Sequence, residues 1–143
     1  MNETEEIDLA SGLAAFESKH FSSAMQYLSP LAKAGNPEAQ YRVAIMLQNG
    51  LGHVANETQA FTWLQQAAEQ NHGLAQHSLG CCYLTGRGTV NDDEAAVYWF
   101  QRAAEHELAG AQLALAELYE QGRGVPVDLA KAKANWLYRQ AGI

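Results

Sequence analysis

Residues 75–104 read "AQHSLGCCYLTGRGTVNDDEAAVYWFQRAA", and related versions of this pattern stand before and after the stretch. When residues 41–76 are set over residues 77–112, 11 of the 36 positions are identical. About three identities are expected by chance in an alanine-rich chain. A fixed period of this length is typical of repeat proteins, in which each unit is one small supersecondary element.

The spacing of the shared positions predicts two helices in each unit. Ala75, Leu79 and Tyr83 are four residues apart, which places them on one helical stripe, and Ala96, Trp99 and Ala103 form a second stripe. A single helix pair does not cover its own apolar face, so neighbouring units must stack. We therefore expect an all-α fold of eight helices in four antiparallel pairs.

The expected organisation is a single repeat domain over residues 1–143. Its units are residues 5–40, 41–76 and 77–112, followed by a truncated terminal repeat at residues 113–143. The first unit lacks the Gly-x-Gly pair of the others and is shorter between its helices.

The glycine pair of each unit is interpreted as helix punctuation. Gly86 is expected to end the first helix by adopting the left-handed conformation, and Gly88 lets the chain turn. Asp92 then caps the next helix. Asn56 and Asp128 have the same role in the other units. A dinucleotide-binding loop needs a preceding strand and a third glycine, and a phosphate loop needs Gly-Lys-Ser/Thr. Neither pattern is present, so phosphate binding is not expected.

The aromatic positions of the repeat are expected to lie in the core, namely Trp63, Tyr83, Trp99 and Tyr119. The last unit breaks this pattern, because Asn135 stands in the tryptophan column and Trp136 follows it. We expect the last helix to rotate so that Trp136 enters the core, since a buried Asn135 without partners is costly. Otherwise Trp136, Leu137 and Ile143 form an apolar patch that a second copy covers.

These columns resemble the Sel-one-like repeat, a branch of the tetratricopeptide superfamily, over residues 41–143. Residues 5–40 resemble an ordinary tetratricopeptide unit. The resemblance implies a right-handed α-solenoid whose first helices line a concave surface. It also implies a non-catalytic adaptor or scaffold with no cofactor. Some cysteine-rich bacterial relatives are linked to β-lactam binding and have disulfides between the helices of a unit, whereas Cys81 and Cys82 here share one helix.

The concave face is predicted from helical phase, as the positions that point away from the partner helix. In order along the chain these are Tyr41, Ile45, Gln48, Asn49, His77, Cys81, Leu84, Thr85, Leu113, Glu117, Glu120 and Gln121. The face becomes acidic towards its C-terminal end, which suits a peptide or helix of some basic character. The alternative is an inner wall that is packed or solvated and binds nothing.

Composition excludes several other classes of protein. The formal net charge is −7, and the nine Lys and Arg residues form no run. Nucleic-acid binding and attachment to acidic membranes are therefore not expected. The acidic start of the chain is unlike a secretory signal, which favours a cytoplasmic location.

No catalytic constellation is apparent either. No histidine pair has zincin spacing, and no serine stands in a nucleophile elbow. We expect no metal site and no enzyme activity. The leading interpretation is a protein-interaction module that binds through its concave face. The alternatives are a β-lactam-binding protein or hydrolase of the cysteine-rich type, and a subunit that self-associates through its last helix.

Overall fold

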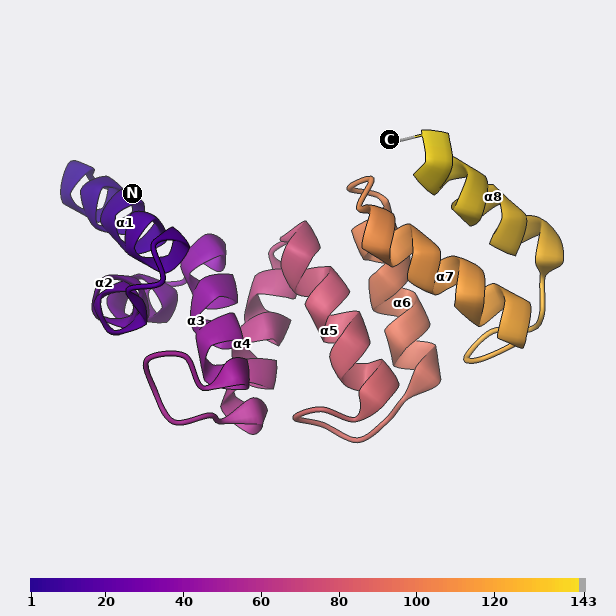
Figure 1. Ribbon diagram of the computed structural model, residues 1–143, viewed down its shortest axis with the longest axis horizontal. Helices are drawn as coiled ribbons and strands as arrows, with labels where there is room; N and C mark the ends of the chain where they lie inside the picture. The colour runs from indigo at the N-terminus through magenta and orange to yellow at the C-terminus, as the bar shows by residue number, and fades with distance from the viewer. Residues whose placement is uncertain (142–143) are drawn as a thin grey trace. The chain divides into compact units, whose positions relative to one another are not determined.

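The structure is a computed structural model that describes the backbone of residues 1–141 and the side chains of residues 1–136. Eight helices and no strand occur in this part of the chain, which confirms the predicted all-α class (Figure 1). They are α1 (Glu3–Glu17), α2 (Phe21–Lys33), α3 (Pro37–Asn49), α4 (Glu57–Glu69), α5 (Gly73–Thr85), α6 (Asp93–Ala104), α7 (Ala109–Gln121) and α8 (Leu129–Ala141).

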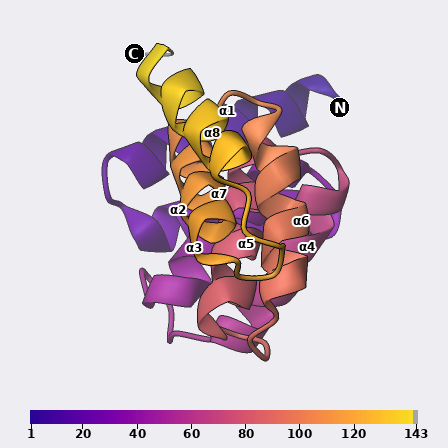
Figure 2. The same ribbon diagram turned by 90° about the vertical axis from the view of Figure 1, so that its right-hand side faces the viewer.

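The helices are grouped in two compact units, of which the first is Met1–His72 and the second begins at Gly73. The first unit contains the pairs α1 with α2 and α3 with α4, which meet through α2 and α3. The second unit repeats this arrangement with α5 to α8, and α6 and α7 join its two pairs (Figure 2). Within each unit, every helix packs against its neighbour in sequence, as expected for stacked hairpins.

The loops follow the predicted punctuation. Gly50, Gly86 and Gly122 all have φ between 67° and 70°, in the left-handed region that glycine adopts without steric cost. The side chain of Asn56 then accepts a hydrogen bond from the backbone N–H of Gln59 at 3.0 Å. Asp92 and Asp128 cap the corresponding helices in the same way, at 3.1 and 3.0 Å.

The second glycine of the pair has an additional role that the sequence did not reveal. A Cβ atom added to Gly52 would lie 2.7 Å from the carbonyl carbon of Phe21, at the start of α2. A Cβ atom added to Gly124 would likewise collide with the backbone of Asp93, at the start of α6. In both units the loop therefore packs directly on the second helix of the preceding pair, and only glycine leaves room for that approach.

The predicted core needs one correction. Trp63 and Trp99 are only half-buried, whereas Leu64 and Phe100, one position later, are completely buried. The second helix of each pair is turned so that the residue after the tryptophan, and not the tryptophan itself, faces the core. In the second unit Phe100 lies against Gly80 of α5, where an added Cβ atom would be 2.9 Å from the ring. Of the two tyrosines, Tyr119 is buried as predicted and Tyr83 is half-buried.

A buried glutamine recurs in every full repeat, at Gln40, Gln76 and Gln112. In the first unit the Gln40 amide donates to the carbonyl oxygen of Ala32, at the end of α2, at 3.1 Å. Its own oxygen accepts from Nε2 of Gln70, which follows α4, at 2.9 Å. The column was visible in the sequence, but its role in joining three helices depends on contacts that the sequence does not show.

Candidate binding surfaces

The predicted concave-face residues lie on the first helix of each pair, on α3, α5 and α7. Seven of them are half-buried and five are exposed. The half-buried set is Tyr41, Ile45, Gln48, His77, Cys81, Leu84 and Leu113. The exposed set is Asn49, Thr85, Glu117, Glu120 and Gln121. The residues open to solvent are therefore polar or acidic.

Tyr41 belongs to a cluster inside the first unit. Its ring centre is 5.0 Å from that of His72, and the guanidinium of Arg42 lies 5.6 Å from its centre. Arg42 and His72 both contact the carboxylate of Glu38, at 2.9 and 2.6 Å. The hydrogen bond from His72, followed by that from Arg42, holds the pKa of Glu38 at about 2 although its partial burial opposes this shift.

His77 does not point away from its partner helix as predicted. Its ring centre is 5.6 Å from that of Phe100 on α6, and its Nε2 atom is 3.2 Å from the place of a Cβ atom on Gly110 of α7. His77 therefore packs among three helices of the second unit. Burial lowers the pKa of His77, which favours the neutral imidazole in this position.

Cys81 lies one helical turn after His77, with its sulfur 4.0 Å from the Nε2 atom of that histidine. A nucleophilic cysteine needs a lowered pKa so that the thiolate is populated. Here burial raises the pKa of the Cys81 thiol. Neither Cys81 nor the buried Cys82 forms a disulfide. The geometry of a cysteine–histidine pair is therefore present without the electrostatics that thiolate chemistry requires.

The helix pair of the last repeat forms a groove with a volume of about 400 Å³, which we call the α7/α8 groove. Its lining residues are Leu113, Ala116, Glu117, Glu120, Leu129, Ala132, Lys133 and Trp136. Three of them were predicted as concave-face residues, namely Leu113, Glu117 and Glu120. The groove combines an apolar floor with two exposed carboxylates and one ammonium group, and its partly exposed tryptophan is available for contact.

Trp136 lies in this groove rather than in the core, so the predicted rotation of the last helix is wrong. Its side chain remains 46% exposed. Asn135 is half-buried, and its Nδ2 atom donates to the carbonyl oxygen of Lys131 at 2.9 Å. The amide is thus satisfied within its own helix, which removes the expected penalty. The side chain of Leu137 and residue Ile143, which were predicted to join an apolar patch, lie outside the described residues.

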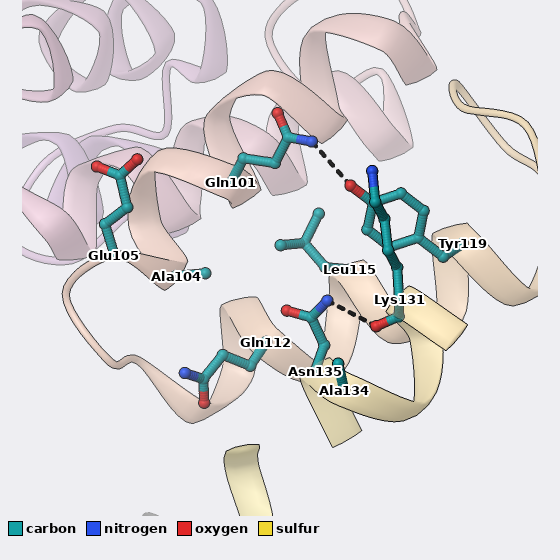
Figure 3. Close-up of a pocket in the computed structure, with 9 residues that line it drawn as sticks. All are labelled: Gln101, Ala104, Glu105, Gln112, Leu115, Tyr119, Lys131, Ala134 and Asn135. Atoms are coloured by element: carbon teal, nitrogen blue, oxygen red, sulfur yellow. Dashed lines mark hydrogen bonds between the residues drawn. The ribbon is translucent and has the colours of Figure 1, made fainter. Parts of the chain in front are cut away.

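A second cavity, which we call the Asn135 pocket, lies between α6, α7 and α8 and has a volume of about 370 Å³ (Figure 3). Its lining residues are Gln101, Ala104, Glu105, Gln112, Leu115, Tyr119, Lys131, Ala134 and Asn135. Leu115 and Ala104 point towards the open space, and Gln101 donates to the hydroxyl of Tyr119 at 2.9 Å. The Asn135 pocket shares no lining residue with the α7/α8 groove. The sequence signalled it only through the unusual residue in the tryptophan column.

Neither surface offers a metal site. Among the residues that the structure describes, no three histidine, cysteine, aspartate or glutamate side chains converge on a point where a metal ion fits. Within the same residues, none of the helices combines the length and the apolar character needed to cross a membrane.

Solved structures provide the most extensive similarities. A Sel1 repeat protein from Oxalobacter formigenes is 28% identical, with a TM-score of 0.89 over 94% of this chain and 56% of its own. The c5321 protein, a protective antigen of uropathogenic Escherichia coli strains with an SLR fold, is 27% identical, with a TM-score of 0.89 over 96% of this chain and 30% of its own. The chain therefore spans about half of the first protein and under a third of the second.

A more distant similarity concerns the fold alone. Cysteine rich protein B of Helicobacter pylori is 19% identical, with a TM-score of 0.65 over 83% of this chain and 85% of its own. A comparison with curated protein sequences found no match.

The sequence also matches a repeat family directly. The Sel1 repeat matches residues 37–72, 73–108 and 109–142. The period is the one expected, although each match begins four residues earlier than the predicted unit. These starting points coincide with the first residues of α3, α5 and α7, so the first turn of each of these helices belongs to the repeat. The chain belongs to the Sel1 repeat family.

Proposed function

We propose that this chain is a non-catalytic protein-interaction module, an adaptor or scaffold, that binds a basic peptide or protein segment through the α7/α8 groove, which contains the acidic end of the predicted concave face. Sel1 repeat proteins are generally protein-interaction modules and are typically non-catalytic. The observation that carries the proposal is the α7/α8 groove, where Glu117 and Glu120 stand beside the exposed ring of Trp136.

The chemistry of the groove specifies the kind of partner. Two carboxylates on one helical face attract lysine and arginine side chains, and an aromatic face adds a favourable contact with a cation. Leu113, Ala116 and Leu129 supply apolar surface for the non-polar residues of the same segment. Lys133 supplies a single opposing charge. An amphipathic segment that presents basic and apolar side chains together fits this arrangement.

A phage-displayed library of random peptides tests the proposal without knowledge of the natural partner. Selection on the intact chain is expected to enrich peptides that carry Lys or Arg beside apolar residues. Replacing both acids, Glu117→Lys with Glu120→Lys, should weaken the selected peptides at least about tenfold, because attraction becomes repulsion. A substitution of His77 would also disturb its packing against Phe100, whereas the charge reversal changes only exposed side chains.

The matched control is Glu69→Lys, which changes an exposed acid at the end of α4 and leaves the groove intact. Peptide affinity should be unchanged in that variant at constant ionic strength. Selection of peptides without basic residues, or equal losses in the groove variant and the control, would overturn the proposal.

A further inference from the structure

The Asn135 pocket has a counterpart in the first unit, which we call the Trp63 pocket. Six of the eight residues that line the Trp63 pocket lie 72 residues, or two repeats, before residues that line the Asn135 pocket. Val43 corresponds to Leu115 and Leu47 to Tyr119. Trp63 itself corresponds to Asn135. The two cavities therefore lie at the same place in the repeat. The first unit has a tryptophan at the corresponding wall position, and the last repeat has an asparagine there.

The exchange of tryptophan for asparagine is the largest loss of side-chain volume among the corresponding lining residues. The Trp63 pocket has a volume of about 210 Å³, whereas the Asn135 pocket has about 370 Å³. Leu115 is larger than Val43 and Tyr119 is larger than Leu47, so these two exchanges act in the opposite direction. Glu105 is smaller than Lys33, but this loss is much smaller than the loss from tryptophan to asparagine.

The walls of the Asn135 pocket match the chemistry of an indole ring. Leu115 and Ala104 provide apolar contact for its faces (Figure 3). The Lys131 ammonium lies 5.6 Å from the centre of the Tyr119 ring and also lines the pocket, so it can make a cation–π contact with a bound ring. The indole N–H is a donor only, and the carboxylate of Glu105 at the rim is an acceptor.

We propose that the Asn135 pocket receives the indole ring of a tryptophan side chain from a bound partner protein. The ring replaces the tryptophan that the repeat lacks at this position. This site rests on the proposed function, since the tryptophan belongs to the bound partner. It lies on a different surface from the α7/α8 groove. A partner that fills the Asn135 pocket and also occupies the α7/α8 groove contacts both sides of the last helix pair.

The direct probe is N-acetyl-L-tryptophanamide, titrated into the intact ¹⁵N-labelled chain and followed by NMR. The side-chain amides of Gln101 and Asn135 should shift and saturate, with a dissociation constant on the order of 1 mM for a ligand of this size. N-acetyl-L-leucinamide should produce no saturable shift, because it has the same backbone amides but lacks the indole ring and the N–H group of that ring.

Two variants locate the binding. Asn135→Trp restores the residue found at this position in the inner repeats, so the chain should fold, become more stable and lose the ligand-induced shifts. Trp63→Asn should open the corresponding pocket in the first unit and create a second set of shifts, near Val43 and Leu47. Absence of saturable shifts in the parent chain, or the same shifts in Asn135→Trp, would overturn the inference.

The failure of this inference is distinguishable from the failure of the proposed function. If basic peptides bind the groove but the tryptophan amide does not bind the pocket, only the inference fails. If the amide binds but every selected peptide lacks tryptophan, the assignment of the occupant is wrong. If the chain self-associates in sedimentation and both Trp136→Ala and Asn135→Trp abolish this, the occupant is a second copy, and the partner proposed here is wrong.

Discussion

At the scale of single residues, the two glycines of each loop have different tasks. Gly50 and Gly52 have nearly the same φ, 67° and 68°. A Cβ atom on Gly50 would approach no neighbouring atom closer than 3.4 Å, whereas one on Gly52 would lie 2.7–2.8 Å from atoms of Phe21 and Ser22. The first glycine is required by its backbone conformation, and the second by its conformation and by its contact with α2.

The two alanine substitutions should therefore differ in their effect on stability. Gly50→Ala is expected to cost about 1–2 kcal/mol, the penalty of the left-handed region for a residue with a Cβ atom. Gly52→Ala has this penalty and in addition about 1–3 kcal/mol from the forced contact with the backbone of α2. Urea denaturation of the two variants measures the difference. Equal losses would mean that the loop leaves α2 without cost.

At the scale of elements, the distance between the helices of a pair depends on a small residue on one helix and a large one on the other. In the second unit Gly80 of α5 faces Phe100 of α6, and both residues are buried. The corresponding residues of the first unit are Ala44 and Leu64, which are equally buried. The volumes change in opposite directions, because a closed core has no spare space.

A double-mutant cycle tests this compensation between α5 and α6. Gly80→Ala alone gains about 1 kcal/mol in helix propensity but loses about 1–3 kcal/mol through overpacking against Phe100. In the background of Phe100→Leu, the same change should become neutral or stabilising, because the double variant recreates the Ala–Leu pair of the first unit. Thermal and urea denaturation of the four proteins give the coupling energy, expected at about 1–3 kcal/mol. Additive effects would show that the two residues do not share space.

At the scale of the whole molecule, the acidic chain should lose stability as the pH falls, and Glu38 is one identifiable source. Its pKa is lowered from 4.5 to about 2 in the folded state, first by the hydrogen bond from His72 and then by that from Arg42. Because the folded value is the lower one, its contribution to stability is present above about pH 4.5 and disappears as the pH falls towards 2.

Glu38→Gln should therefore reduce the free energy of unfolding near pH 6, and the difference from the parent chain should shrink near pH 3. The groups around this carboxylate are His72, Arg42 and, beyond Arg42, Glu17 at 3.3 Å from its guanidinium. Urea denaturation at the two pH values measures the change. Glu69→Gln, at an exposed position on α4, serves as the control and should show no such pH dependence.

The sequence by itself determined the repeat, the helix pairs and the loop conformations of this protein. These features depend on contacts within about four residues and on a period of 36 residues, both of which are visible in one dimension. The positive φ of Gly86 and the cap at Asp92 follow from local chemistry of this kind. The acidic residues of the last repeat could also be placed on an open face from helical phase.

Only the tertiary structure decided which neighbour each side chain meets. A rotation of one residue, about 100° around the helix, separates a buried Phe100 from a half-buried Trp99, and a columnar alignment does not resolve it. For the same reason, the sequence wrongly predicted Trp136 in the core. The structure leaves Trp136 exposed, and Asn135 instead donates its amide hydrogen bond within its own helix. The Asn135 pocket is also a tertiary feature, because a missing side chain becomes a cavity only where three packed helices fail to close over it.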